Sequence, residues 1–323
     1  MGKKEERRKK AMNELLELQK KVFTLFTQTN YDEALQTIAE IEEKYPEMKD
    51  KTSFWKACLY SMTGRPDAAV QTLRAALKEG YWWNPDQMLN DEDLKPLREL
   101  DAFKEIVEES RNRFEVSKST GSSDLLLYPS DKHQVPMPLL YVLHWRGDSA
   151  ERFSRYWAPE RLGERIHVAF PQSSQIYGYH AYCWDDGKLA RNEIYDQFSV
   201  VVSRVAVDEE QVILAGASQG GKLAFELALE GTPIQVKGFI VVVPSIRDVA
   251  GYQSLIEKAK GNFIRGWIIT GDQDHYYEST VALHRDLERA GIACKLVVVK
   301  GMGHFFPENF ADLLQEALDD LLR

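Results

Sequence analysis

The sequence predicts two domains of different class: an all-α domain over residues 1–118, then a mainly parallel, doubly wound α/β domain over residues 119–323. Two observations lead to this fold class. Residues 11–115 repeat apolar side chains at helical spacing and contain almost no strand-like run. From residue 124 onward, short apolar runs alternate with helix-like segments, which is typical of a parallel sheet covered by helices on both faces.

The helical part carries an internal period. Small and apolar residues of "YDEALQTIAEIEEKYP" recur about 35 residues later in "PDAAVQTLRAALKEGY". Between these copies, Gly64 ends one helix and Pro66 begins the next, which predicts a helix–turn–helix. The pattern resembles two degenerate tetratricopeptide repeats. Three roles stay open for this domain: it binds a partner peptide, dimerises the protein or covers the cleft as a cap.

An aromatic run, Tyr81-Trp82-Trp83, follows the second copy. We expect it to seal the end of the helical array, since a short array needs a cap over its last apolar face. A peptide-binding surface is the alternative. The polar, turn-rich stretch "SKSTGSSD" after the last helix predicts the domain boundary.

The α/β part contains seven strand candidates. They are residues 125–128, 139–144, 166–170, 211–215, 238–243, 266–270 and 295–299. The aromatic segment "SQIYGYHAYCW", residues 174–184, has two equal interpretations: it lines a substrate cleft, or it is a long loop packed by its own aromatic rings.

Composition excludes several classes of function. With 44% hydrophobic and 28% charged residues, the chain is of the ordinary globular kind. A net charge of −9 argues against nucleic acid as a partner, because binding phosphates needs a basic surface. Cys58, Cys183 and Cys294 are far apart, which suits a reducing compartment. No signal peptide or membrane-spanning run is apparent, so we predict a cytoplasmic protein without a membrane span.

One glycine-rich turn fits two kinds of site, a nucleophilic serine or a phosphate-binding loop. Residues 216–220, "GASQG", match the G-x-S-x-G elbow that presents a nucleophilic serine between a strand and a helix. The same turn also reads as G-x-x-x-x-G-K, most of a phosphate-binding loop. That loop needs Ser or Thr after Lys222 to ligate magnesium, and Leu223 stands there instead. The sequence therefore favours the elbow, with Ser218 as nucleophile.

The partners of a catalytic serine follow in the chain order expected for such an elbow: Ser, acid, His. Asp272 and Asp274 come just past one strand candidate, and His304 comes just past the next. Because parallel strands end at the same edge of a sheet, we expect these side chains to meet Ser218 there. From the spacing alone, either aspartate could be the acid.

Four segments together resemble a known family. "GASQGGKLA", "GDQD" and "GMGH" are similar to segments of the carboxylesterase, phospholipase and acyl-protein thioesterase group of α/β-hydrolases, and "LHWRGDS" stands in place of that group's Leu-His-Gly-x-Gly-Asp. The resemblance covers about residues 135–323 and leaves the helical part outside. It implies the α/β-hydrolase fold. It also implies Asp274 as the acid, and we expect Asp272 to hold its loop through local hydrogen bonds.

The resemblance further implies an oxyanion hole made by the backbone N–H groups of Gln219 and Arg146. Trp145 departs from the pattern, because it replaces a glycine that tolerates positive φ. Either the loop takes an ordinary backbone path, or the hole is built differently. Trp145 is also a candidate for lining the substrate pocket, together with Tyr182 and Trp184 of the loosely similar segment "YCWDD".

Other polar residues receive structural interpretations. We expect His144 to hydrogen-bond the oxyanion loop and His275 to be a loop residue, with substrate contact as its alternative. Asp185 and Asp186 are expected to cap or form a turn. The histidines show no short metal-ligand spacing, so the sequence predicts no catalytic metal and no cofactor.

These observations predict a serine hydrolase that cleaves small-molecule carboxylic esters or thioesters through an acyl-enzyme. An amidase or peptidase with the same triad is one alternative. A protein that interacts through its helical domain and carries a non-catalytic hydrolase core is the other.

Overall fold

The computed structural model describes residues 3–132, 134–231 and 233–323. These residues form two compact units. One contains the residues up to Gly121 together with Ile176–Tyr179, and the other contains residues 122–175 and 180–323.

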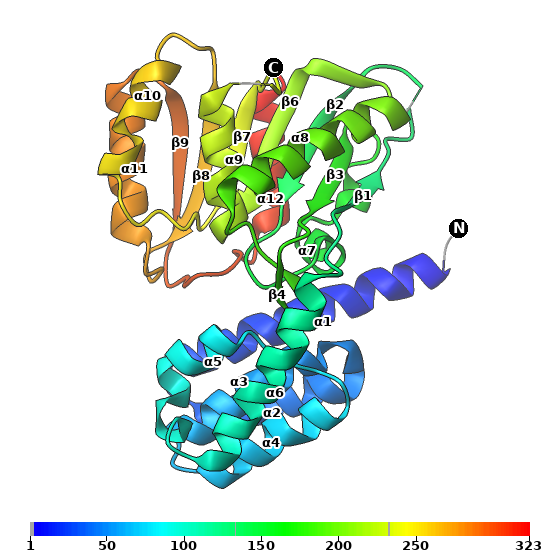
Figure 1. Ribbon diagram of the computed structural model, residues 1–323. Helices are drawn as coiled ribbons and strands as arrows, with labels where there is room; N and C mark the ends of the chain where they lie inside the picture. The colour runs from blue at the N-terminus through cyan, green and yellow to red at the C-terminus, as the bar shows by residue number, and fades with distance from the viewer. Residues whose placement is uncertain (1–2, 133, 232) are drawn as a thin grey trace. The chain divides into compact units, whose positions relative to one another are not determined.

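The first unit is built from helices (Figure 1). They are α1 (Lys3–Thr27), α2 (Tyr31–Lys44), α3 (Lys49–Met62), α4 (Pro66–Lys78), α5 (Pro85–Asn90) and α6 (Asp101–Lys118), with 3-10 turns η1 (Pro46–Met48) and η2 (Glu92–Leu97). Consecutive helices pack as α1 on α2 and α3 on α4. The α3–α4 turn follows from its sequence, because Gly64 has a φ of 71° and Pro66 is the first residue of α4.

The aromatic run after α4 belongs to the interior of this unit. Trp82 and Trp83 are buried among side chains of α3, α4 and α6. The indole Nε1 of Trp83 donates to the Asp50 carbonyl at 2.7 Å, which gives its polar atom a partner inside the core. This is the burial expected of residues that close a helical array.

The second unit contains a seven-stranded sheet. Its strands are β1 (Asp124–Tyr128), β2 (Met137–Leu143), β3 (His167–Gln172), β6 (Val207–Ala217), β7 (Gly238–Val242), β8 (Arg265–Gly271) and β9 (Ala293–Val299), in the order β1-β3-β2-β6-β7-β8-β9. β1, at one edge, pairs antiparallel with β3, and the other pairings within the described part of this sheet are parallel. Every strand candidate of the sequence overlaps one of these strands, and the candidates 139–144, 166–170 and 238–243 each run one residue beyond it.

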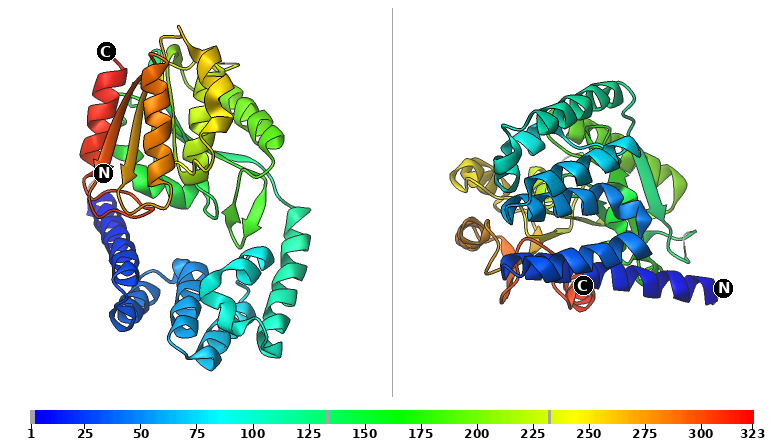
Figure 2. Two further views of the ribbon diagram at one scale, coloured as in Figure 1. Left: turned by 90° about the vertical axis from the view of Figure 1, so that its left-hand side faces the viewer. Right: turned by 90° about the horizontal axis from the view of Figure 1, so that it is seen from below.

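Helices cover both faces of this sheet (Figures 1 and 2). On one face lie α8 (Gly187–Arg204), α9 (Ser218–Glu230), α10 (Gln253–Ala259) and α11 (Tyr277–Arg289), and on the other lie α7 (Ala150–Trp157) and α12 (Phe310–Leu321). Successive residues of β2 show the pleat, since Tyr141 and Leu143 join the first apolar layer while Leu140 and Val142 join the second. Burial on both faces explains the unbroken apolar runs in the sequence.

The segment 174–184 corrects one expectation. It is not an irregular loop packed only on itself, because it forms the two-stranded sheet of β4 (Ile176–Gly178) and β5 (Ala181–Tyr182). Residues 176–179 cluster with the helical unit, where Ile176 and Tyr179 pack against the apolar core. The Tyr179 N–H also donates to the Trp82 carbonyl at 3.3 Å. Ile176 and Tyr179 therefore serve packing.

Candidate active site

The serine elbow joins β6 to α9 without an intervening loop. β6 ends at Ala217 and α9 begins at Ser218, whose φ of 50° is unusual for a residue with a side chain. The flanking glycines allow this turn to pack closely. A Cβ at Gly220 would lie 2.3 Å from the Leu143 carbonyl oxygen, and one at Gly216 would lie 2.7 Å from the Gly220 backbone. Backbone contacts this close require glycine at both positions.

The three side chains expected to form a triad are joined by hydrogen bonds. His304 Nε2 lies 2.8 Å from Ser218 Oγ, and His304 Nδ1 lies 2.9 Å from Asp274 Oδ1. Ser218 follows β6, Asp274 follows β8 and His304 follows β9, so three parallel strands deliver them to one edge of the sheet. With its proton on Nδ1, the neutral imidazole donates to the carboxylate and accepts the serine proton at Nε2.

Asp274 is held as a buried carboxylate. Burial opposes its ionisation, but the hydrogen bond and charge of His304, with the N–H of Tyr276 at 3.0 Å, hold its pKa below the ordinary value. The lowered pKa keeps the Asp274 side chain negatively charged at neutral pH. A group that orients and stabilises an imidazolium needs this charge.

Asp272 hydrogen-bonds to the loop backbone and not to His304. Its Oδ1 accepts the Gly301 N–H at 2.7 Å, and its own N–H donates to the Val299 carbonyl at 3.3 Å. These bonds tie the turn after β8 to the turn that carries His304. Asp272 therefore secures the loops, while the hydrogen bond to His304 belongs to Asp274.

The two residues expected to supply the oxyanion hole are linked through their side chains. Gln219 Nε2 donates to Asp185 Oδ1 at 2.6 Å, and the Arg146 guanidinium donates to the same oxygen. Gln219 Oε1 also accepts the Trp184 N–H at 3.0 Å. Gln219 lies in the first turn of α9, where backbone N–H groups have no partner within the helix. Asp185 thus connects the elbow with the loop after β2.

The sequence interpretation of the paired aspartates was half right. Asp186 caps α8, accepting the N–H groups of Lys188 and Leu189 at 3.0 Å each. Asp185 does not act as a cap in this way, because its carboxylate turns toward Arg146 and Gln219. No sequence signal separates the two roles, since they depend on which residues the fold brings near.

Trp145 takes an ordinary backbone path, which resolves the question raised by its replacement of glycine. The positive φ in this loop falls on Gly147, at 81°. The Trp145 indole donates to Asp148 Oδ2 at 2.8 Å. Its ring contacts a cluster of aromatic side chains, namely Phe153, Tyr156, Phe305 and Phe306. Phe305 directly follows His304, so this cluster forms an aromatic wall adjoining the triad.

His144 and Trp184 pack against each other beneath the loop after β2. Their rings stack at 4.6 Å, and the Trp184 indole donates to the His144 carbonyl at 2.8 Å. Burial lowers the pKa of His144 to about 4, so its ring is neutral at pH 7. Trp184 is only 4% exposed and therefore braces the loop instead of offering a surface to substrate. Tyr182 is half-buried and bonds through its backbone to Gly147 and Asp148.

Other residues singled out in the sequence have ordinary environments. Lys222 pairs with Glu226 at 3.6 Å on the surface of α9. Burial raises the pKa of Cys183 to about 12, which leaves its thiol protonated.

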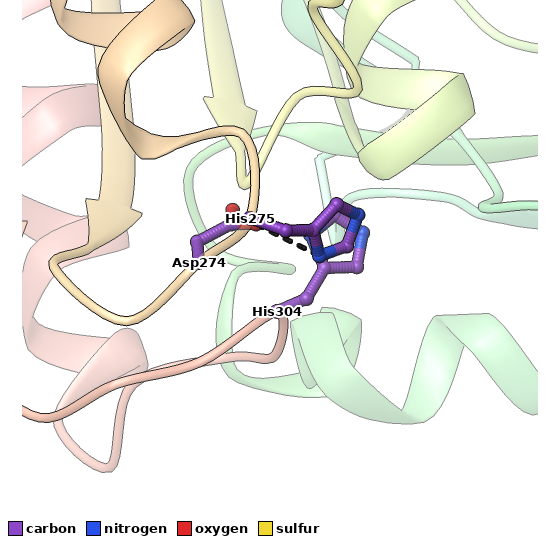
Figure 3. Close-up of side chains that lie close together, drawn as sticks. All are labelled: Asp274, His275 and His304. Atoms are coloured by element: carbon purple, nitrogen blue, oxygen red, sulfur yellow. Dashed lines mark hydrogen bonds and ion pairs between the residues drawn. The ribbon is translucent and has the colours of Figure 1, made fainter.

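His275 lies closer to the triad than the sequence indicated. Its side chain is 63% exposed, and its Nδ1 lies 3.5 Å from Asp274 Oδ1. Its ring centroid lies 4.7 Å from that of His304. Figure 3 shows the two imidazoles side by side at the Asp274 carboxylate. Adjacency to Asp274 in the sequence did not reveal this convergence, because it depends on the loop after β9.

Comparison with known proteins supports the fold. Residues 13–118 match the family model described as the A/B hydrolase-like N-terminal domain. The crystal structure of an uncharacterized protein from Bacillus cereus ATCC 10987 has 24% sequence identity and a TM-score of 0.54, covering 95% of this chain and 99% of that chain. None of the curated proteins matches.

Two further solved structures are similar to a part of the chain. A phospholipase/carboxylesterase from Dyadobacter fermentans DSM 18053 is 19% identical, with a TM-score of 0.45, and covers 63% of this chain and 98% of that chain. An S-formylglutathione hydrolase from Staphylococcus aureus is 15% identical, with a TM-score of 0.49, and covers 62% of this chain and 96% of that chain.

The fold class predicted from the sequence is confirmed: an α/β-hydrolase fold preceded by a helical domain. The tetratricopeptide assignment of the helices stays a prediction. Among the residues that the structure describes, no helix has the length and apolar character needed to cross a membrane.

Proposed function

We propose that this chain is a serine hydrolase that cleaves carboxylic esters or thioesters through an acyl-enzyme intermediate. The observation that carries the proposal is the hydrogen-bonded chain from Ser218 Oγ through both His304 nitrogens to Asp274 Oδ1, with distances of 2.8 and 2.9 Å. Hydrogen bonds of this length suit proton transfer between a nucleophile and its general base.

In the proposed mechanism, Ser218 Oγ attacks the acyl carbon while His304 Nε2 accepts the hydroxyl proton. Asp274 stabilises the imidazolium that forms. The negative charge on the acyl oxygen is received by the backbone N–H groups of Gln219 and Arg146. Collapse of the tetrahedral intermediate transfers the proton from His304 to the departing alcohol or thiol. Water then repeats the sequence on the acyl-serine and releases the acid.

Support for Gln219 and Arg146 as the oxyanion donors comes from their shared partner Asp185. A carboxylate that binds both side chains limits how far the two backbone segments can separate. Such preorganisation matters, because donors that need no rearrangement at the moment of reaction stabilise charge best.

We also propose that the partly exposed rings of the aromatic wall, those of Trp145, Tyr156 and Phe305, contact the apolar part of the substrate. The wall adjoins His304, and apolar surface near a reacting carbon favours small or medium organic esters. The unpaired state of Cys58, Cys183 and Cys294 fits the further proposal of a cytoplasmic location.

A substrate panel tests the proposal. We expect p-nitrophenyl esters and acyl-thioesters to be hydrolysed by the full-length protein, with the matching p-nitroanilides at least about 100-fold slower because an amine is the poorer leaving group. Ser218→Ala should reduce the ester rate by at least about 1000-fold. Cleavage of the anilides faster than the esters would show that the protein is an amidase. Equal rates for wild type and Ser218→Ala would show that the hydrolase core is not catalytic.

A further inference from the structure

A second histidine stands at the triad without a place in the proposed reaction. One ligand atom from each of Asp274, His275 and His304 lies within 4.8 Å of the other two. Both Nδ1 atoms approach the same carboxylate oxygen, Asp274 Oδ1, at 3.5 Å for His275 and 2.9 Å for His304 (Figure 3). Hydrolysis as proposed requires only one of the two imidazoles.

We infer that Asp274, His275 and His304 form a binding site for a divalent transition metal, with Zn²⁺ as the ion that fits best, and that metal binding switches the hydrolase off. The consequence for activity rests on the proposed function. The binding itself rests only on the geometry of the three side chains.

The ligand set and its spacing match zinc. Two imidazole nitrogens and one carboxylate oxygen are a common set for tetrahedral zinc, with water as the fourth ligand. Zinc bonds of about 2.0–2.2 Å place neighbouring ligand atoms about 3.3 Å apart in a tetrahedron. The separations of the two imidazole nitrogens from Asp274 Oδ1, 2.9 and 3.5 Å, lie on either side of that value, and all three ligand atoms lie within 4.8 Å of one another. Rotation of the exposed His275 imidazole would complete the tetrahedral set.

An ion can reach this site from solvent. The His275 side chain is 63% exposed and that of His304 is 25% exposed, while the Asp274 carboxylate is buried beneath them. A hydrated ion therefore meets His275 first, then exchanges two further waters for Asp274 and His304 and keeps one water as its fourth ligand. Because His275 is not a member of the triad, its replacement affects metal binding and leaves the triad complete.

Metal binding would disable His304 through its tautomer. In the working triad, the single proton of the neutral ring is on Nδ1 and the lone pair of Nε2 accepts the Ser218 proton. A metal on Nδ1 occupies the lone pair there, so that proton moves to Nε2. Nε2 then has no lone pair for the serine proton, and Ser218 stays a neutral, weak nucleophile. Chelation of the metal reverses each step.

One nearby charge opposes the metal. The exposed Arg247 guanidinium donates through Nε to Tyr276 Oη at 3.3 Å, next to His275 in the sequence. A fixed positive charge near the site weakens cation binding, so we expect affinity in the micromolar range and not tighter. Arg247→Gln should accordingly strengthen zinc binding several-fold.

A second group could also hold metal and has to be separated from the first. Cys58, Asp91 and Asp93 of the helical unit lie equally close together. Burial raises the pKa of the Cys58 thiol well above its ordinary value, which keeps the thiol in the non-ligating form. Any zinc bound there would be unaffected by replacing His275.

The test uses full-length protein, freed of metal with EDTA and then transferred to chelator-free buffer. We expect micromolar Zn²⁺ to inhibit p-nitrophenyl acetate hydrolysis and EDTA to restore it, while Mg²⁺, which prefers oxygen ligands, has no effect. His275→Asn should raise the half-inhibitory concentration of Zn²⁺ at least about tenfold. His180→Asn, a matched change at an exposed histidine outside the cluster, should leave it unchanged.

Each variant is compared with its own rate without metal, so a change in basal activity does not affect the result. Equal zinc sensitivity of wild type and His275→Asn would overturn the inference, as would no inhibition at about 100 µM Zn²⁺.

Calorimetric titration with Zn²⁺ separates this inference from the proposed function. Ser218→Ala retains all three ligands, so it should bind zinc as wild type does, whereas His275→Asn should lose that binding. If the protein hydrolyses no ester yet shows this pattern, the metal site stands and the proposed function fails. If it hydrolyses esters but lacks the His275-dependent binding, only the metal site fails.

Discussion

At the residue scale, the site depends on a few side chains whose surroundings differ sharply although they are neighbours in the sequence. Asp272 and Asp274 are two positions apart, yet one binds the backbone of Gly301 and the other binds His304. Asp185 and Asp186 are adjacent, yet one joins Arg146 to Gln219 while the other caps α8. In each pair, substitution of one aspartate tests a proposed role, and the same substitution of its neighbour is the matched control.

The first pair tests the acid of the triad. Asp274→Asn should lower kcat by about 10³–10⁴-fold, because an amide neither fixes the productive tautomer of His304 nor stabilises its charged form. Asp272→Asn should cost less than about tenfold, since the new carbonyl oxygen can still accept the Gly301 N–H. Steady-state kinetics with a p-nitrophenyl ester measures both, and the reverse ranking would make Asp272 the acid.

The second pair tests Asp185 as a positioning residue. Asp185→Asn weakens two charge-assisted hydrogen bonds and should lower kcat roughly 10–100-fold with little change in KM, because displaced oxyanion donors affect the transition state most. Asp186→Asn should be nearly neutral, since asparagine is an equally good helix cap. A change confined to KM, or an equal loss in both variants, would assign Asp185 a role in substrate binding or folding.

The triad residues were readable from the sequence, but the residues around them were not. Strand periodicity and chain order were enough to predict that Ser218, an aspartate after β8 and His304 meet, because each follows an apolar strand. The choice of Asp274 over Asp272 came from the family resemblance. Asp185 and His275 sit beside other polar residues in loops, and only the path of those loops in space gives them partners.

At the element scale, β2, β6 and α9 pack so closely that side chains are excluded between them. Gly220 lies against the backbone at the end of β2, and His144 and the loop with Arg146 follow the same strand end. The packing of this junction therefore also fixes the place of the proposed oxyanion donors.

Substitution of Gly220 tests this packing. A methyl group 2.3 Å from the Leu143 carbonyl oxygen must push α9 away from β2, so Gly220→Ala should lower the free energy of unfolding by at least about 2 kcal/mol and abolish activity. Gly163→Ala, where the added carbon meets no atom within 4 Å, should change stability by less than about 0.5 kcal/mol. Urea unfolding measures both, and similar values would contradict the close packing.

His144 makes this junction sensitive to acid. Its pKa is lowered from 6.5 to about 4 by burial, so below pH 6.5 the unfolded chain binds a proton that the folded protein does not. The free energy of unfolding therefore decreases as the pH falls from 6.5 toward 4. The decrease due to His144 is about 3 kcal/mol at most. Urea unfolding at pH 7 and pH 4.5 should show a loss about 2 kcal/mol smaller in His144→Gln. Parallel losses would contradict a buried neutral histidine.

At the scale of the whole molecule, the two units were visible in the sequence because their hydrophobic periods differ. Helical spacing gives way to strand-like runs near residue 124, and β1 begins there. The order of the strands and the edge position of β1 are not encoded in local periodicity. The same holds for residues 176–179, whose place in the helical unit depends on distant contacts with Trp82 and its neighbours.

Covalent labelling with a fluorophosphonate, followed by intact-protein mass spectrometry and peptide mapping, tests the proposed chemistry most directly. The probe mimics an acyl substrate and becomes attached to the activated serine. We expect one adduct per full-length chain, mapped to Ser218, absent in Ser218→Ala and strongly slowed in His304→Ala. An unlabelled wild-type protein, or labelling that persists in Ser218→Ala, would contradict the assignment of Ser218 as the nucleophile.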